Sequence, residues 1–89
     1  VVRPIDLVAA FTAFANLGAP VEPRFVVSVF DAAGRSVFGQ SVRTLPVAMD
    51  SAVAYVTLSL MQEAVESGTA TSVRRYLPAS IPIAGKTGT

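Results

Sequence analysis

The sequence predicts an α+β segment in which helices accompany an antiparallel sheet. Two stretches, at residues 4–17 and 51–67, carry the apolar spacing of helices. Between them, two short runs rich in Val and Phe flank an Asp-Ala-Ala-Gly turn, which is typical of a β-hairpin. A last apolar run, at residues 81–84, has the length and composition of one more strand.

The composition indicates a chain that buries part of its surface against something outside itself. Of its 89 residues, 52% are apolar and 15% are charged, and the mean hydropathy is +0.56. A small domain exposes a large share of its surface and needs more polar residues than this. We therefore expect residues 1–89 to be part of one larger domain and to contain no complete domain.

Charge and residue types exclude several classes of function. The net charge is +1, and the charges are scattered singly except for Arg74 and Arg75, which we expect to be a solvated pair, so no nucleic-acid partner is predicted. The chain has neither Cys nor His, which removes thiol catalysis, a Ser-His-Asp triad and nearly all transition-metal sites. No stretch is long enough to span a bilayer, so we expect any membrane anchor to lie elsewhere in a parent protein.

The first helix is predicted over residues 4–17. Pro4 suits its first turn, where a missing N–H costs nothing, and Asp6 favours the positive end of the helix dipole. Apolar side chains occur nearly all round, which predicts burial on more than one side. Gly18 is expected at the left-handed C′ position, and Pro20 prevents the helix from restarting.

A hairpin with strands at residues 25–30 and 35–38 is predicted next. Asp31 can accept hydrogen bonds from the backbone that follows it, and Gly34 can take the positive φ of the turn. An isolated hairpin is marginal in water, so we expect this one to lean on other structure.

The second helix, at residues 51–67, has the strongest pattern. Its apolar positions are spaced i, i+4, i+7 and i+11 and are Ala54, Leu58, Met61 and Val65. Asp50 suits the N-cap and Gly68 the end of the helix, and a short helical turn is expected at residues 69–76.

The string Gly-Lys-Thr-Gly at residues 85–88 contains the only lysine of the chain. A phosphate-binding P-loop needs a glycine where Ser80 stands, and Pro82 falls inside the would-be loop. The other interpretation is Lys-Thr-Gly, the third signature of penicillin-binding proteins and serine β-lactamases. Such a motif lies on a strand, where the cation holds a substrate anion, the hydroxyl donates to it, and the glycine lets the substrate backbone approach.

Several separated strings together resemble the transpeptidase domain of penicillin-binding proteins. The strings are Pro4-Ile5-Asp6-Leu7, Phe14-Ala15-Asn16-Leu17-Gly18, Val29-Phe30-Asp31-Ala32-Ala33-Gly34-Arg35, Glu66-Ser67-Gly68-Thr69-Ala70 and Ala84-Gly85-Lys86-Thr87-Gly88-Thr89. Their order and spacing resemble the segment that ends at the Lys-Thr-Gly strand in class A, the bifunctional glycosyltransferase/transpeptidases, more than in class B. The resemblance covers essentially the whole chain and implies part of a serine β-lactamase/D,D-transpeptidase-like fold.

Two motifs of the family are absent from this chain. Its nucleophile lies in Ser-x-x-Lys, but Ile83 stands three residues before Lys86, the only lysine. Its second motif is Ser-x-Asn, but Phe14 stands two residues before Asn16, the only asparagine. The resemblance therefore implies a segment with one of three catalytic motifs and no nucleophile, inactive by itself.

The resemblance also implies a role for each residue of the last motif. Lys86 would orient the substrate carboxylate or the matching β-lactam anion, and Thr87 would donate a hydroxyl to the same anion. Gly88 would let the substrate pack closely, and the backbone N–H of Thr89 would be one donor of the oxyanion hole. The catalytic candidates are thus Lys86 and Thr89, and no metal ligand is expected.

For the parent protein, the resemblance implies a D,D-transpeptidase that cross-links peptidoglycan stem peptides through a serine acyl-enzyme. The expected partners are the stem peptide, β-lactams and the rest of the transpeptidase domain, with no cofactor. The expected location is the extracytoplasmic face of the bacterial cell membrane, to which the parent is anchored. Two alternatives stay open: a serine β-lactamase, and a non-catalytic structural module in which Lys-Thr-Gly is incidental. A Ser-x-x-Lys motif upstream would favour an enzyme over the module.

Overall fold

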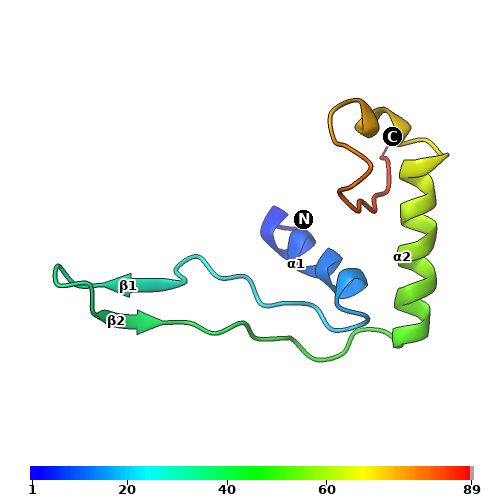
Figure 1. Cartoon of the computed structure of the whole chain (residues 1–89). Coiled ribbons are helices and arrows are strands. Elements are labelled where there is room, and N and C mark those ends of the chain that lie inside the picture. Colours follow the sequence, from blue (N-terminus) through cyan, green and yellow to red (C-terminus); the bar gives the residue numbers. More distant parts are fainter. Residues whose placement is uncertain (89) are drawn as a thin grey trace.

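The structure is a computed structural model that describes residues 1–88. Along the chain its elements are α1 (Pro4–Ala15), β1 (Ser28–Phe30), β2 (Ser36–Gly39), α2 (Ser51–Glu66) and the short 3₁₀ helix η1 (Thr71–Arg75). The helices gather at one end, and the two strands lie at the tip of a long arm that extends away from them (Figure 1). Within the described part of the chain, no helix combines the length and apolarity needed to cross a membrane.

The chain does not fold around a compact interior. Its radius of gyration is 16.8 Å, whereas a compact domain of this length has about 12 Å. Its accessible surface is 6765 Å², against about 4,900 Å² for a folded monomer of this mass. Part of the surface that a complete domain would bury is therefore exposed.

The first helix ends in a Schellman motif, which changes the predicted role of Gly18. The left-handed C′ residue is Leu17, with φ 49°, so the placement of Gly18 at C′ is wrong by one position. Gly18 follows with φ 120°, and its N–H donates to the Ala13 carbonyl over 2.7 Å. Only glycine fits there, because a Cβ would lie 2.4 Å from the carbonyl oxygen of Met49.

The hairpin arm, residues 20–45, contains the predicted turn but shorter strands. The Asp31 carboxylate accepts from the N–H groups of Ala33 and Arg35, each over 2.9 Å, and Gly34 has φ 78°. These contacts confirm the turn. Regular pairing is limited to Ser28–Phe30 and Ser36–Gly39, with an irregularity between Val29 and Phe30.

The rest of the arm is a loose ribbon. Isolated backbone hydrogen bonds join its two sides, from Leu45 to Pro20 over 2.7 Å and from Glu22 to Arg43 over 2.9 Å. Every residue of β1 and β2 is exposed. The predicted strand residues before Ser28 are not strand, because a two-stranded ribbon with no covering layer has little besides backbone bonds to hold its register.

The second helix, Ser51–Glu66, confirms its prediction closely. The Asp50 side chain caps it, accepting from the N–H groups of Ala52 and Val53. Gly68 follows the end of the helix and lies so close to the preceding turn that a Cβ would be 2.8 Å from the Cα of Ala64. The predicted helical turn after it is η1.

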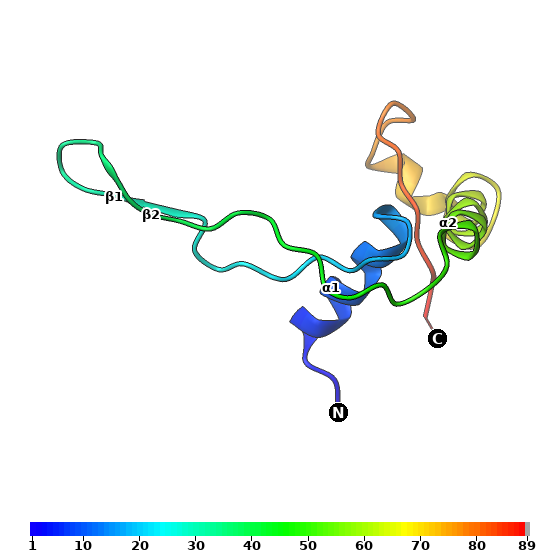
Figure 2. The same ribbon diagram turned by 90° about the horizontal axis from the view of Figure 1, so that it is seen from below.

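The small interior lies between the helices. Figure 2 shows α1 and α2 lying near one another, with the arm leading away from them. The buried apolar residues, among those described, come from α1, α2 and the turn that precedes η1, and are Ala9, Ala13, Ala54, Val65 and Ala70. Four of the five are alanines, so this interior is shallow.

The strand predicted at residues 81–84 is wrong for this structure. Nothing between residues 76 and 88 is strand. The sheet that the described residues form contains β1 and β2 alone, so this segment has no strand partner there. Pro78 and Pro82 also lack the N–H groups that a ladder uses. The final segment packs on α2 instead, where the Gly85 N–H donates to the Met61 carbonyl over 3.1 Å.

Candidate functional site

The Lys-Thr-Gly segment, residues 82–88, is braced against the second half of α2. Besides the backbone hydrogen bond from Gly85 to Met61, Gly85 lies over the buried Val65: a Cβ on Gly85 would be 3.8 Å from its Cγ2. In Figure 1 this segment returns toward α2 after the loop that follows η1. The contacts of Gly85 with α2 therefore hold the start of the Lys-Thr-Gly string against this helix.

The Lys86 side chain is exposed and available to an anion. Its Nζ donates to the carbonyl oxygen of Thr87 over 2.5 Å. Four ion pairs are present among residues 1–88, and none of them involves Lys86. A lysine that forms no ion pair within the protein can bind an anionic ligand through its ammonium group.

The Thr87 hydroxyl lies 2.9 Å from the hydroxyl of Thr69. Both residues are exposed. Gly88 is also exposed, and apart from Gly88 and its chain neighbours no described residue has an atom within 4 Å of the place where its Cβ would be. Lys86, Thr87 and Gly88 are thus three consecutive exposed residues; the fourth predicted residue, Thr89, lies outside the described residues.

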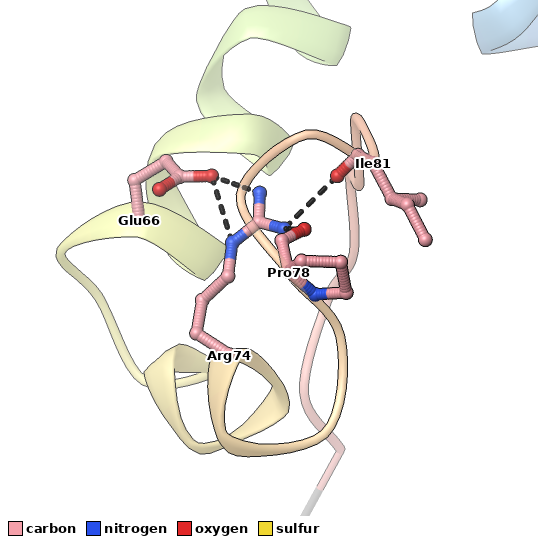
Figure 3. A network of polar contacts seen from close by, with 4 residues as sticks. All are labelled: Glu66, Arg74, Pro78 and Ile81. Carbon is pink, nitrogen blue, oxygen red and sulfur yellow. Dashed lines mark hydrogen bonds and ion pairs between the residues drawn. The ribbon is translucent and has the colours of Figure 1, made fainter.

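Arg74 forms a polar network that the sequence did not reveal (Figure 3). Its Nε donates to the Glu66 carboxylate over 3.1 Å, and its Nη2 pairs with the same oxygen. Its Nη1 donates to two backbone carbonyls, of Pro78 over 3.0 Å and of Ile81 over 2.9 Å. The side chain is only 18% exposed, so the prediction of a solvated pair is wrong for Arg74, whereas Arg75 is exposed.

This network ties the loop after η1 to the end of α2. A guanidinium has five donors in a rigid fork, so one side chain can bind a carboxylate and two carbonyls together. The bound carbonyls belong to the loop that leads directly into the Lys-Thr-Gly segment. Arg74 therefore sets the path by which that segment reaches α2. No residue pattern indicates this, because carbonyl acceptors have no sequence signature.

An apolar cleft of about 400 Å³ lies between α1, α2 and the start of the Lys-Thr-Gly segment. Its lining is mainly apolar and includes Phe11, Phe14, Leu58, Met61 and Ile83. Neither Lys86 nor Thr87 lines it, so the cleft is separate from the candidate anion site. Among the described residues, no cluster of acidic side chains could hold a metal ion.

Comparisons with known proteins agree on one family. The family model described as "Penicillin binding protein transpeptidase domain" matches residues 2–89. Penicillin-binding protein 2D of Bacillus subtilis (strain 168) is 40% identical over 60 residues, which is 67% of this chain and 8% of the relative. Penicillin-binding protein 1A of Clostridium novyi (strain NT) is 34% identical over 79 residues, 89% of this chain and 9% of the relative.

A third relative covers nearly the whole chain. Penicillin-binding protein 1B of Haemophilus influenzae (strain ATCC 51907 / DSM 11121 / KW20 / Rd) is 33% identical over 88 residues, 99% of this chain and 11% of the relative. The chain thus spans about a tenth of the length of these relatives. No significant match to a solved structure was found. The family predicted from the sequence strings is confirmed: the chain belongs to the penicillin-binding protein transpeptidase domain family.

Proposed function

We propose that this chain is the part of a serine D,D-transpeptidase domain that carries the substrate-anion site. The observation behind the proposal is the exposed Lys86 ammonium, which has no carboxylate partner among residues 1–88 and lies in a segment braced on α2. The match of the transpeptidase family model over residues 2–89 supports it. The Val-x-Asp-x-x-Gly-Arg hairpin and the Gly-Thr-Ala string favour class A, the bifunctional type.

In this proposal the chain supplies binding groups and another part of the domain supplies the nucleophile. The Lys86 ammonium binds the carboxylate at the end of a stem peptide, or the carboxylate of a β-lactam, and the Thr87 hydroxyl donates to the same anion. Gly88 leaves room for the substrate backbone, and the Thr89 N–H stabilises the oxyanion. Lys86, Thr87, Gly88 and Thr89 are thus the proposed substrate-binding residues.

The reaction itself is acyl transfer. A serine hydroxyl outside this chain attacks the carbonyl between the two D-alanines of a stem peptide and releases the terminal D-alanine. The acyl group then passes from the serine to an amine on another peptide strand, and a β-lactam acylates the same serine. These steps use covalent catalysis by the serine, together with acid–base and electrostatic catalysis, so no cofactor is proposed.

The proposal also covers the setting of the chain. The apolar surface that this chain exposes would be covered by the rest of the transpeptidase domain. The parent would be anchored in the bacterial cell membrane by a segment outside these residues and would act on its extracytoplasmic face. Because the nucleophilic serine lies outside this chain, residues 1–89 alone would form no acyl adduct.

The test uses the complete protein and a fluorescent penicillin. We expect Lys86→Ala to lower the second-order acylation rate by about tenfold to a hundredfold, because a hydrogen bond to a charged group is lost. Lys86→Arg should recover part of the rate, since the charge is kept, and Thr87→Val should cause a milder loss. Thr89→Ala should matter least, because alanine keeps the backbone N–H.

The melting temperature of each variant serves as the control, since Lys86 is exposed and little packing is lost. An unchanged acylation rate in Lys86→Ala would contradict the anion site. Covalent labelling of residues 1–89 alone would contradict the proposed division of roles.

A further inference from the structure

The hydroxyl of Thr69 lies against a proposed substrate-binding group from a distant part of the sequence. Thr69 stands between α2 and η1, and Thr87 follows 18 residues later, yet their Oγ1 atoms are 2.9 Å apart. Thr69 belongs to none of the residues so far given a role. The contact joins the Gly-Thr-Ala string to the Lys-Thr-Gly string.

The backbone on both sides of this contact is held in place. Ala70 is buried, and its N–H donates to the Ala64 carbonyl over 2.9 Å. Gly68 lies against the same turn of α2, too close to accommodate a side chain. On the other side, the Gly85 N–H is bonded to Met61. Thr69 and Thr87 therefore meet because both adjoin the same end of α2.

The hydrogen-bonding capacity of a hydroxyl decides the direction of the contact. A hydroxyl has one hydrogen to donate and two lone pairs that accept. If Thr87 gives its hydrogen to a substrate carboxylate, it can take part in the contact with Thr69 only as an acceptor, so Thr69 must be the donor. Each bond in such a chain polarises the next, so the donation also strengthens the bond to the anion.

The lysine beside Thr87 makes a separate contact with the same residue. Lys86 Nζ donates to the backbone carbonyl oxygen of Thr87. The ammonium therefore lies next to the residue that carries the hydroxyl. Without Thr69, the Thr87 hydroxyl is free to rotate and to donate its hydrogen bond to water instead. With Thr69 present, its hydrogen bond would fix the Thr87 rotamer in which the hydroxyl and the Lys86 ammonium can bind the same anion.

We propose that Thr69 is a positioning residue for substrate binding, which donates to Thr87 and aims its hydroxyl at the substrate carboxylate. The proposal rests on the proposed function, because it needs Thr87 to bind that anion. It extends the anion site from the final segment to the turn that follows α2.

A double-mutant cycle in the complete protein tests this inference. We expect Thr69→Val, which keeps the shape of the side chain, to lower the acylation rate by a penicillin about three- to tenfold, the effect of one neutral hydrogen bond. Thr69→Ser keeps the hydroxyl and should retain most of the rate. In a Thr87→Val background, Thr69→Val should have no further effect, because the hydroxyl that it orients is gone.

Two controls separate positioning from a general change in structure. Thr71→Val alters an exposed threonine two residues away, whose hydroxyl makes no hydrogen bond with residues 1–88, and should leave the rate unchanged. A neutral ester of the same penicillin lacks the carboxylate, so Thr69→Val should slow its acylation much less than that of the free acid.

Three results would overturn the inference. In the first, Thr69→Val is acylated as fast as the unmodified protein while Thr87→Val is acylated slowly. This would show that Thr69 has no role in the anion site and would leave the proposed function intact. Another is an equal loss in both backgrounds, which would assign Thr69 a structural role. The third is a normal rate in both Thr87→Val and Lys86→Ala, which would refute the proposed function itself and this inference with it.

Discussion

The helical end and the hairpin arm are both rich in apolar residues, but only the helical end fully buries any of them. All the buried apolar residues among residues 1–88 belong to α1, α2 and the turn before η1. In the arm, Phe25, Phe30 and Val37 are 85%, 59% and 62% exposed. Apolar composition alone therefore does not make an interior; an opposing surface is needed.

The two regions also differ in the kind of contact that holds them. At the helical end, Arg74 joins α2 to the loop that follows η1. Thr69, in the turn before η1, joins that turn to the Lys-Thr-Gly segment. In the arm, backbone hydrogen bonds, local ion pairs and the bond from Arg24 to the Gln40 carbonyl join facing residues of the ribbon. One bond, from the Val21 N–H to the Thr12 hydroxyl, joins the base of the arm to α1. The arm therefore needs a covering surface, which in our proposal the rest of the domain supplies.

The same substitution made in each region gives the largest expected difference. Val65 is 1% exposed, and Val65→Ala should lower the free energy of unfolding by about 2 kcal/mol through lost burial and a residual cavity. Val37→Ala, in exposed β2, should change it by less than about 0.5 kcal/mol. Urea unfolding of the chain, followed by the helical circular dichroism signal, measures both. Equal losses would show that the arm shares the interior of the helical end.

Adjacent arginines provide a second, smaller comparison within the helical end. Arg74→Met should lower the free energy of unfolding by about 1–2 kcal/mol, because it leaves Glu66 and two loop carbonyls without their donor. Arg74→Lys should recover only part, since an ammonium lacks the planar fork. Arg75→Met is the matched control and should stay within about 0.5 kcal/mol. Equal free energies of unfolding for Arg74→Met and Arg75→Met would show that the network does not stabilise the fold.

The smallest expected effect concerns the turn at the tip of the arm. Hydrogen bonds from the backbone N–H and then the side chain of Arg35 lower the pKa of Asp31 below its ordinary value. A lowered pKa in the folded state means that the carboxylate stabilises the turn fully above the ordinary pKa of about 4, and that this contribution is lost as pH falls through the lowered value. The amide chemical shifts of Ala33 and Arg35 should follow that titration. Asp31→Asn keeps an acceptor oxygen but cannot ionise, so it should abolish the pH response; a response that persists would contradict the assignment.

Elements whose signals lie within a few neighbouring residues could be predicted from the sequence alone. The Asp50 cap and the apolar spacing from Ala54 to Val65 predict α2, which begins at the predicted residue. The turn at Asp31 and Gly34 is likewise confirmed. Such features depend on backbone preferences and on hydrogen bonds between near neighbours, so the local sequence contains their cause. The five strings were enough for the family as well.

The contacts of the final segment, in contrast, depend on how distant parts of the chain come together. The apolar run at 81–84 has the composition of a strand, but a strand forms only where a partner backbone lies alongside, and α2 lies there instead. The network of Arg74 and the pairing of Thr69 with Thr87 join residues up to 18 positions apart. Their distances depend on how the chain turns after Gly68, where close packing against Ala64 sets the direction. Contacts of this kind follow from the path of the backbone in space, which no window of neighbouring residues contains.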